Sequence, residues 1–580
     1  MKNNILILAL SLAGAMVAHA QLAPGGGVRV SPAADALEIS GKDASGIWQP
    51  VMRIATGAID SATDPVAACV AYTLPSGKRS QYSNSYVETL YTLADGTRLQ
   101  VRVYDDGVCW RGAHDYTVDI CAATRSWLMN WVDCYEEFFV QDRTDLAAGK
   151  RLGYPALLEY PGGVYMLLTE SGIAHYGAGT SMWATGRRGK FELRPDGPEM
   201  PGWQTAIVGS LSRVVESSLV LDNSEPAEPI DFSWVQPGVA SWIYWAHNNG
   251  SRDYDTVCSY IDLAAELGLP YTLIDADWHL MDGGHTIEDA LDYAAARGVR
   301  PMIWYNSSIG WVNGAPGPQY RLNTPEDMER EFAWCEDHGI AGVKVDFFSG
   351  DTRPNLELMH AILVCAARHK LLVNFHGAPL PRGWQRTWPN LLSTEAVYGA
   401  EWYNNVPTFT SRAAAHNATL PFTRNVVGSM DYTPCAFSDS QHPHITTHAH
   451  ELALTALYES GLQHLADRPE SFLAQPEAVR QYLGSLPAAW DETLMLGGYP
   501  GRYAMLARRS GDRWYIAAIN GTDGPITIES DYSRIPAAPG AVRTFADSGD
   551  TTSPWLITDT ETLPATIDLA PRGGIVIVAE

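Results

Sequence analysis

The chain has 580 residues, of which 46% are hydrophobic, which is enough for several packed cores and excludes an intrinsically disordered protein. Its 66 Asp and Glu outnumber its 40 Lys and Arg, and the net charge of -26 argues against partners such as nucleic acid and anionic membrane surfaces. The 19 Trp and 27 Tyr are numerous; flat rings beside polar groups suit sugars, although packing in cores is their commoner use.

Residues 1–20 are typical of a secretory signal peptide. One Lys precedes an apolar run that ends in Ala18-His19-Ala20, and we expect cleavage before Gln21. The run is too short for a comfortable membrane span and nothing later supplies one, so the sequence predicts no span. The mature protein is therefore expected to be exported, with the periplasm as its location.

Residues 21–232 are predicted to form an N-terminal β-sandwich. Short alternating segments are separated by turn signals such as Asp95-Gly96 and Asp106-Gly107, which are typical of antiparallel hairpins. The stretch 224–238 is rich in Pro and acidic residues and resembles a linker at the end of this domain.

After the linker, strands alternate with helices, which predicts a parallel sheet. Eight such units over residues 233–487 predict a closed (β/α)8 TIM barrel, and the renewed alternation over 488–580 predicts a C-terminal antiparallel β domain. The expected barrel strands are 239–245, 271–279, 300–306, 341–348, 370–377, 391–399, a segment near 420–430, and 461–467.

The stretch AGVKVDFFSGD, residues 341–351, places Lys344 and Asp346 two positions apart in an apolar strand. Because side chains alternate along a strand, both face the same side, and with Val343 and Val345 toward the helices the pair faces the barrel axis. A buried ion pair contributes little net stability, whereas barrel active sites lie at the carboxyl ends of the strands. We therefore favour a functional role over a structural ion pair.

Two carboxylates from different strands can carry out glycoside hydrolysis, one as nucleophile and the other as general acid/base. Lys344 would hold Asp346 ionised, as a nucleophile requires, whereas the second carboxyl group must be protonated and needs a more apolar setting. Glu401, flanked by Trp402 and Tyr403, is a candidate for the second. The residues alone leave this choice open, because other carboxylates near strand ends compete, namely Asp275, Asp277 and Glu395.

The predicted substrate-binding residues include Lys344 itself. Asp275 and Asp277 lie two apart in one predicted strand and would share a face, one to bind sugar hydroxyls and the other to cap the barrel mouth. His376 is either a core histidine or a hydrogen-bonding partner of the substrate.

Several longer motifs resemble glycoside hydrolase family 97, a family of exported bacterial α-glycosidases. The resemblance spans nearly the whole mature chain and implies the same order of sandwich, barrel and C-terminal β domain. It rests on LLTESGIAHYGAG (167–179), FHGAPLPRGWQRTWPNLLSTEAVYGAEW (375–402), PFTRNVVGSMDYTP (421–434) and THAHELALTALYESGLQHLAD (447–467).

The resemblance also implies a mechanism. Inverting members carry a glutamate base directly after the fifth-strand histidine, where this chain has Gly377, and Asp346 stands where retaining members place their nucleophile. Asp346 is thus expected to attack the anomeric carbon, with Glu401 as general acid/base. Because retaining members resemble α-galactosidases, the expected activity is exo-acting hydrolysis of an α-galactoside or oligosaccharide. The alternatives are an α-glucosidase of the same family and a non-catalytic carbohydrate-binding protein.

The resemblance further implies a Ca²⁺ ion beside the substrate, held by carboxylates as a hard cation prefers. Matched by position, the ligands are Glu170, Glu395 and Glu401, and the fourth ligand of inverting members falls on Gly377. The site is therefore expected to be altered or completed by water. A directly bound cation would lower the pKa of Glu401 and oppose its role as an acid, so a looser or water-mediated contact is the alternative.

Overall fold

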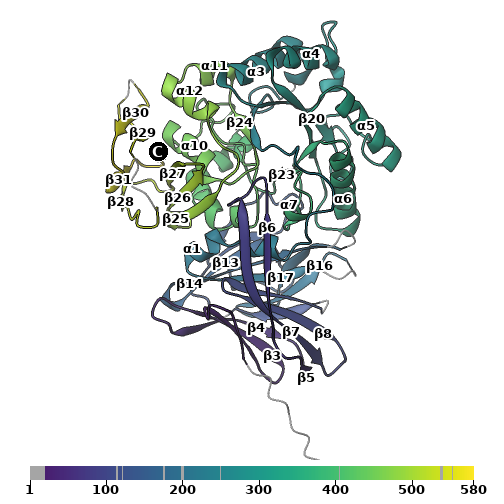
Figure 1. The fold of residues 1–580 in the computed structure, drawn as a ribbon, viewed down its shortest axis with the longest axis vertical. Helices are drawn as coiled ribbons and strands as arrows, with labels where there is room; N and C mark the ends of the chain where they lie inside the picture. Colours follow the sequence, from purple (N-terminus) through teal and green to yellow (C-terminus); the bar gives the residue numbers. More distant parts are fainter. Residues whose placement is uncertain are drawn as a thin grey trace, which may run out of the picture.

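The computed structural model describes residues 20–112, 115–120, 122–173, 177–197, 202–248, 250–403, 405–535, 540–550 and 553–580. Figure 1 shows three regions: an N-terminal sheet domain, a barrel with helices around it, and a C-terminal sheet domain beside the barrel. The predicted signal peptide lies outside the described residues, apart from Ala20. Among the described residues, no helix has the length and apolar character that crossing a membrane would require.

The described part of the N-terminal domain is one antiparallel sheet of 17 strands that folds over on itself, which confirms the predicted sandwich. Strands β2 and β3 of one half pack on β8 and β17 of the other. The turn signals lie where expected, because Gly96 adopts a φ of +86° between β7 and β8. The strands are β1 Gln21–Leu22, β2 Val28–Pro32, β3 Ala36–Lys42, β4 Trp48–Ala55, β5 Ile59–Ala62, β6 Val66–Thr73, β7 Gln81–Leu93, β8 Arg98–Tyr104, β9 Gly107–Arg111, β10 Tyr116–Asp119, β11 Arg125–Asn130, β12 Val140–Gln141, β13 Arg151–Tyr160, β14 Val164–Ser171, β15 Thr180–Ala184, β16 Lys190–Pro195 and β17 Trp203–Gly209.

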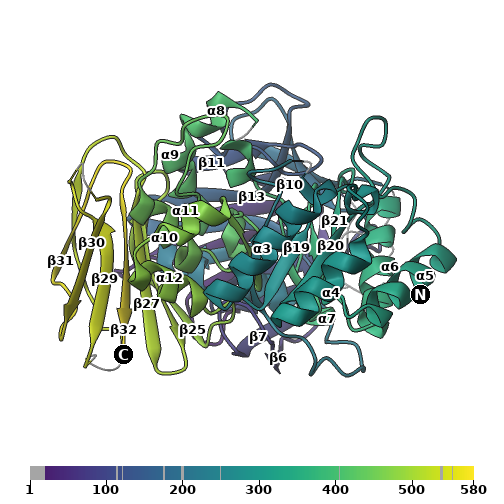
Figure 2. The same cartoon turned by 90° about the horizontal axis from the view of Figure 1, so that it is seen from above.

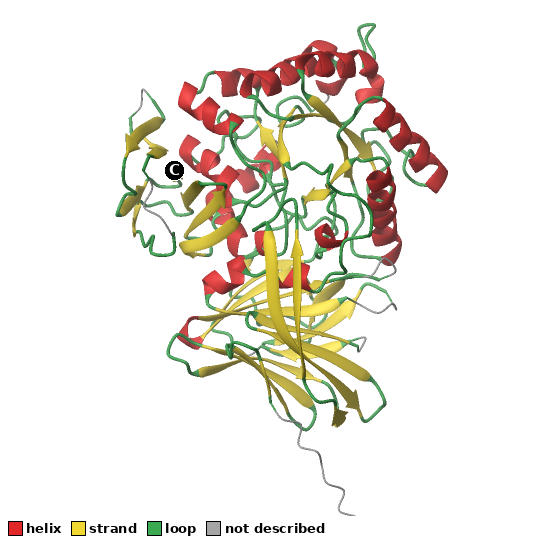
Figure 3. Ribbon diagram, viewed as in Figure 1, coloured by secondary structure: helices red, strands yellow, loops and turns green. Residues whose placement is uncertain are grey.

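In its described residues, the barrel contains seven parallel strands in the order β23-β22-β21-β20-β19-β18-β24, with helices on the outside (Figure 3). Buried residues of the barrel and the N-terminal domain form one continuous core. The strands are β18 Gly238–Trp242, β19 Tyr271–Ile274, β20 Arg300–Asn306, β21 Gly342–Asp346, β22 Leu372–Phe375, β23 Leu391–Thr394 and β24 Leu462–Ala466.

Helices connect and cover these strands, and their ends follow local capping chemistry. The Asp253 side chain accepts a hydrogen bond from the backbone N–H of Thr256 at the start of α3, and Gly268 ends that helix at a φ of +75°. The α-helices are α1 Leu211–Glu216, α2 Leu219–Asp222, α3 Tyr254–Leu267, α4 Ile287–Arg297, α5 Pro325–Asp337, α6 Arg353–Arg368, α7 Trp384–Thr387, α8 Pro407–Thr410, α9 Ala413–Asn417, α10 His448–Leu457, α11 Pro469–Leu473 and α12 Glu477–Gly484. The 3₁₀ turns are η1 Pro161–Gly163, η2 Gly250–Arg252, η3 Trp278–Leu280, η4 Ala400–Tyr403, η5 Leu420–Phe422 and η6 Arg424–Val426.

The strand predicted near 420–430 is wrong, because this segment contains the 3₁₀ turns η5 and η6. Only a single parallel bridge, between Thr394 and Met430, replaces the missing strand at the gap between β23 and β24. The Arg424 guanidinium lies in this gap and donates to the backbone carbonyls of 394–396 and 428–429. One cation therefore satisfies the carbonyl groups that a ladder of strand hydrogen bonds would otherwise have paired.

The C-terminal region has a six-stranded antiparallel sheet, in the order β25-β26-β27-β32-β29-β30, and a two-stranded sheet of β28 and β31. Helix α10 packs against β27 and β32, which attaches this sheet to the barrel (Figure 2). The strands are β25 Glu492–Tyr499, β26 Tyr503–Ser510, β27 Arg513–Asn520, β28 Ile526–Glu529, β29 Val542–Asp547, β30 Trp555–Thr560, β31 Thr566–Leu569 and β32 Gly574–Ala579.

Candidate active site

Strand β21 places Lys344 and Asp346 as its alternation predicts, on the face toward the barrel axis. Asp346 pairs in register with Asn306 of β20 and retains 9% exposure, whereas Lys344 is 2% exposed. Nζ of Lys344 lies 4.0 Å from Oδ2 of Asp346 and 3.3 Å from Oδ2 of Asp275. Burial opposes the charge of Lys344, but these two carboxylates outweigh burial and raise its pKa, so it stays an ammonium.

Asp346 is held at both oxygens. The indole N–H of Trp304 donates to Oδ2 at 3.1 Å, and the backbone N–H of Phe347 donates to Oδ1 at 2.7 Å. Burial raises the pKa of Asp346, while the charges of Lys344 and His376 and the Trp304 hydrogen bond oppose that rise. The side chain is therefore fixed in direction, and Lys344, His376 and Trp304 favour its anionic form, although burial leaves its pKa raised overall.

Gly377 directly follows His376 and closely approaches Asp346. It has a φ of +48°, and a Cβ built there would lie 2.7 Å from the backbone N of Phe347 and 2.8 Å from Oδ1 of Asp346. Real Cβ atoms do not approach other atoms so closely, and a positive φ favours glycine. A side chain at position 377 and the observed position of Asp346 are therefore mutually exclusive.

Glu401 lies in the 3₁₀ turn η4, after β23. Burial and the charge of Glu395 raise the pKa of Glu401 well above its usual range, and the charge of Glu136 acts in the same direction. A carboxyl group that keeps its proton near neutral pH can act as a general acid. The structure thus gives Asp346 and Glu401 different electrostatic settings.

Glu136 of the N-terminal domain reaches the same cluster, and sequence analysis missed it. The indole N–H of Trp402, next to Glu401, donates to Oε2 of Glu136 at 2.6 Å. Burial and the charges of Glu395 and Asp346 raise the pKa of Glu136. The available signal was a pair of acidic residues among aromatic ones, in CYEEFF (134–139), on a segment outside regular secondary structure.

His376 lies between two carboxylates. Its Nδ1 is 3.3 Å from Oε1 of Glu395, and its Nε2 is 2.7 Å from Oδ2 of Asp431, which also accepts from His464. Burial opposes a charged imidazole, but the carboxylates outweigh it and raise the pKa of His376. Both ring nitrogens of His376 therefore contact carboxylates, and His376 positions Glu395. This geometry does not support the other predicted role of His376, that of a hydrogen-bonding partner of the substrate.

The expectation that Asp275 and Asp277 share a strand face is wrong, because β19 ends at Ile274. Asp275 accepts from the Trp242 indole at 2.8 Å and pairs with Lys344. Asp277 instead has a φ of +66°, pairs with Arg252 at 2.8 Å and accepts from the backbone N–H of Gly317. It holds loops at the barrel mouth, which matches the capping role and not the sugar-binding role.

The structure does not bring Glu170 to the cluster. Both of its oxygens accept from the backbone N–H of Thr180, and Arg382 pairs with Oε1 at 2.5 Å. Arg382 also pairs with Asp351, whose Oδ2 accepts from the Tyr135 hydroxyl at 2.8 Å. Glu170 thus belongs to a buried ion-pair network that ties the N-terminal domain to the barrel. Tyr135 of this network directly precedes Glu136.

The remaining predicted ligands do come together. Ligand atoms of Glu395 and Glu401 lie within 4.8 Å of each other and of His376, which was not among the predicted ligands. Burial would raise the pKa of Glu395, but His376 and the Gly377 N–H outweigh burial and lower it, so this residue is anionic. The two carboxylates of this group offer oxygen ligands, which suit a hard cation, and the charge of Glu136 acts on Glu401 from the N-terminal domain.

Two carboxyl groups at the carboxyl ends of barrel strands, one beside the ammonium of Lys344 and one with a pKa well above its usual range, define the class of protein as a glycoside hydrolase. Family models support this class along the chain: "Glycosyl-hydrolase 97 N-terminal" matches residues 58–226, "Glycoside hydrolase 97" residues 239–397, and "Glycosyl-hydrolase 97 C-terminal, oligomerisation" residues 489–580.

Relatives agree with these matches. A "Probable retaining alpha-galactosidase" of Streptomyces bingchenggensis is 36% identical over 72% of this chain and 67% of its own length. A "Retaining alpha-galactosidase" of Bacteroides thetaiotaomicron is 25% identical over 77% of each chain. A crystal structure of a "beta-arabinopyranosidase" superposes with a TM-score of 0.85 at 25% identity, over 96% of this chain and 99% of that one. The chain therefore belongs to glycoside hydrolase family 97.

Proposed function

We propose that this glycoside hydrolase is an exo-acting, retaining α-galactosidase with Asp346 as nucleophile and Glu401 as general acid/base. The observation that carries the retaining mechanism is the close approach of Gly377 to Asp346, which leaves no room for a glutamate base at position 377. The names of the two relatives support the choice of galactoside. The low exposure of Asp346 supports exo action, because a nearly closed site admits the end of a sugar chain more readily than its middle.

In the first step, Oδ2 or Oδ1 of Asp346 attacks the anomeric carbon, and Glu401 gives its proton to the departing glycosidic oxygen. Trp304 and the Phe347 N–H hold the carboxylate in place, and Lys344 supports its charge until the covalent bond forms. Bond formation neutralises Asp346, so the ammonium of Lys344 is then held by Asp275.

In the second step, the deprotonated Glu401 takes a proton from water, which attacks the anomeric carbon and releases Asp346. Two inversions at one carbon return the original configuration. We include Lys344 and Asp275 among the groups that contact the sugar, because Lys344 lies beside the nucleophile on β21 and pairs with Asp275, which directly follows β19.

We further propose that Glu136, Glu395 and Glu401 hold a Ca²⁺ ion beside the sugar. The fit rests on the crowded carboxylates, since oxygen ligands in a flexible shell suit Ca²⁺ better than Mg²⁺. When bound, the ion would supply positive charge next to sugar hydroxyls. Water-mediated contact with Glu401 would leave that carboxyl group its proton.

Hydrolysis of 4-nitrophenyl α-galactoside, followed by proton NMR of the first product formed, tests the main proposal. We expect α-galactose first, with the β anomer appearing only as the sugar mutarotates. β-Galactose as the first product would contradict the retaining mechanism, and faster hydrolysis of the α-glucoside would favour the α-glucosidase alternative.

The "beta-arabinopyranosidase" neighbour supports a second candidate substrate. A β-L-arabinopyranoside has the ring configuration of an α-D-galactopyranoside and lacks only its hydroxymethyl group. Comparing kcat/KM for the two 4-nitrophenyl glycosides decides between them: a site that contacts the hydroxymethyl group prefers the galactoside, and one that has no room for it prefers the arabinoside.

We also propose that the protein acts in the periplasm, on the basis of the leader that ends in Ala18-His19-Ala20. Fractionation of the native host with an activity assay and N-terminal sequencing tests this location. We expect a mature chain that begins at Gln21 in the periplasmic fraction.

A further inference from the structure

A cavity of about 770 Å³ lies where the three regions of the chain meet. Strands β11 and β12 form one wall, the segment around α9 forms a second, and the turns after β25 and β27 form the third. Its volume falls within the range of ~300–1,000 Å³ that is typical of small-ligand sites. Nothing in the proposed reaction uses this cavity.

The cavity gathers positive charge in an acidic protein. Exposed Arg125, Arg412 and Arg502 line it from three different regions, although the whole chain carries a net charge of -26. Among the described residues, neither Arg412 nor Arg502 has a carboxylate partner, and Arg125 has only Asp142 at 3.8 Å. The lining carboxylate, Asp523, is itself paired with Arg572 at 2.7 Å. The cavity therefore presents guanidinium groups without a matched anion.

Aromatic rings form the walls between these arginines. Cζ of Arg412 lies 3.7 Å from the centroid of the Phe138 ring, which fixes that guanidinium over a flat surface. Trp127 contacts Tyr499 edge to face at 5.5 Å, and the Tyr499 ring is only partly buried. Apolar ring surface beside fixed donors is the combination that binds the C–H face and the polar groups of a sugar.

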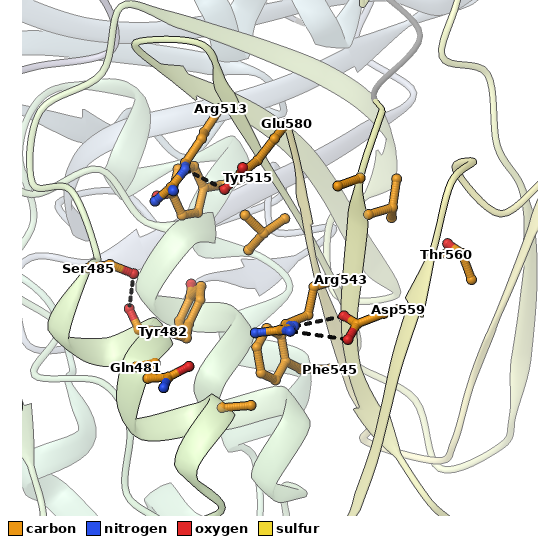
Figure 4. A pocket seen from close by; sticks show the side chains of 14 residues that line it. Gln481, Tyr482, Ser485, Arg513, Tyr515, Arg543, Phe545, Asp559, Thr560 and Glu580 are labelled. Carbon is orange, nitrogen blue, oxygen red and sulfur yellow. Dashed lines mark hydrogen bonds and ion pairs between the residues drawn. The ribbon is translucent and has the colours of Figure 1, made fainter.

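A second cavity, between α12 and the C-terminal sheet, gives the contrast (Figure 4). It has a volume of about 470 Å³ and also contains two arginines, but each is neutralised: Arg513 pairs with Glu580 at 2.6 Å, and Arg543 pairs with Asp559 at 2.7 Å. The guanidinium groups of that cavity are already satisfied, so unpaired arginines are a distinguishing feature of the junction cavity.

The junction cavity shares a wall with the catalytic cluster. Phe138 lies two residues after Glu136, and its ring packs on Tyr398 at 4.9 Å. Tyr398 in turn packs on Trp402 at 5.0 Å, and Trp402 donates to Glu136. A saccharide held in the cavity would therefore lie behind the side chains that position the N-terminal glutamate in the active site.

We propose that the junction cavity is an accessory binding site for an acidic oligosaccharide, with Arg412 and Arg502 binding its anionic group and Tyr499 stacking on a sugar ring. The anionic group is a carboxylate or a sulfate ester, both of which match the forked guanidinium donors. The site is separate from the proposed hydrolysis and holds acidic saccharide beside the catalytic barrel.

Calorimetric titration of the full-length mature protein with three β-1,4-linked trisaccharides tests the proposal. The probes are trimannuronate, chemically sulfated mannotriose and neutral mannotriose, none of which has an α-glycosidic bond to cleave. We expect at least one anionic probe to bind and the neutral one to bind at least about tenfold more weakly. The anionic probe that binds more tightly shows whether the site prefers a carboxylate or a sulfate ester. Added NaCl should weaken the binding of that probe.

Arg412→Gln and Arg502→Gln should each weaken that binding by about tenfold, since each removes a charge-assisted contact. Arg188→Gln removes one exposed positive charge from the turn between β15 and β16 and serves as the matched control, with wild-type affinity expected. Melting curves confirm that each variant is folded, and Arg502→Lys keeps the charge for comparison. Equal binding of neutral and anionic probes, no binding of either anion by the wild type, or wild-type affinity in both glutamine variants would overturn the proposal.

Discussion

The carboxylate of Asp346 occupies the space that a side chain at position 377 would need. A Cβ at position 377 would lie 2.8 Å from Oδ1 of Asp346, although the residues belong to different strand ends, β21 and β22. A nucleophile on the fourth predicted strand and a base after the fifth therefore exclude one another sterically. This contact gives a physical reason why a single site follows either the retaining or the inverting course and cannot combine the two.

The first prediction concerns this contact directly. Gly377→Ala should lower kcat/KM by about 100-fold or more, because displacing a reacting group by about 1 Å can cost that much. The positive φ at 377 adds strain for any residue with a Cβ. Steady-state kinetics on 4-nitrophenyl α-galactoside measures the loss, and wild-type activity in the alanine variant would contradict the predicted clash.

Gly377→Glu should not convert the enzyme to an inverting one. The backbone N of Phe347 would lie 2.7 Å from the new Cβ, so the clash persists even in an Asp346→Ala background. NMR of the first product anomer checks this, and efficient release of β-galactose by either variant would show that position 377 has room for a base.

Asp346→Ala should abolish turnover while the protein stays folded. Removing the attacking carboxylate takes away the covalent route, and we expect a loss on the order of 10⁴-fold or more. Sodium azide should restore part of the activity, because the small anion can enter the vacated space, and the product should be the β-galactosyl azide. An α-configured azide, or nearly full activity without azide, would reject Asp346 as the nucleophile.

Glu401→Gln should discriminate between leaving groups. A poor leaving group needs its oxygen protonated in the transition state, and general acid catalysis contributes about 10²–10⁴-fold. The loss in the glycosylation step should therefore be large for an alkyl or oligosaccharide substrate and small for a dinitrophenyl galactoside. Equal losses for both kinds of substrate would remove Glu401 from the role of acid.

The pH profile of kcat/KM should be bell-shaped, with its basic limb shifted to higher pH than an ordinary glutamic acid would give. Glu401 must be protonated, so activity falls as pH rises through its pKa, which burial and Glu395 raise well above the usual range. Asp346 must be ionised, so activity falls as pH drops through its pKa, which burial also raises. In Glu401→Gln, measured with an activated galactoside, the basic limb should disappear while the acidic limb remains. Persistence of the basic limb would assign it to another group.

Regular elements could be predicted from the sequence because their chemistry is local. Strand alternation placed Lys344 and Asp346 correctly, and apolar neighbours indicated the desolvation that raises the pKa of Glu401. The missing barrel strand could not be foreseen, since Arg424 donates to the carbonyls of residues 394–396, which are distant from it in sequence. The end of β19 at Ile274 was equally hidden, because no Gly or Pro marks the turn that follows.

Glu136 was missed for a different reason. It lies outside regular secondary structure in the N-terminal domain, and only the packing of two domains brings it to Trp402. Glu170, from the same domain, matched a motif but is held by Arg382 inside the domain interface. The sequence indicates that an N-terminal carboxylate takes part, but the choice between the two depends on tertiary packing.

The last prediction concerns which of these two residues, Glu136 or Glu170, binds the metal ion. Chelation with EDTA should reduce activity, and Ca²⁺ should restore it better than Mg²⁺, because the carboxylate set is irregular and Mg²⁺ requires tight octahedral geometry. Glu136→Gln should weaken Ca²⁺ binding, measured by calorimetry on chelated protein, with little change in melting temperature. Glu170→Gln should do the reverse: it leaves Arg382 without one of its two buried carboxylates, and breaking a buried pair costs about 3–5 kcal/mol of stability. Titrating the chelated enzyme with Ca²⁺ avoids a false negative from ion lost in purification. If Glu170→Gln lowered the Ca²⁺ affinity while Glu136→Gln bound the ion as the wild type does, the ligand assignment made from the structure would be wrong.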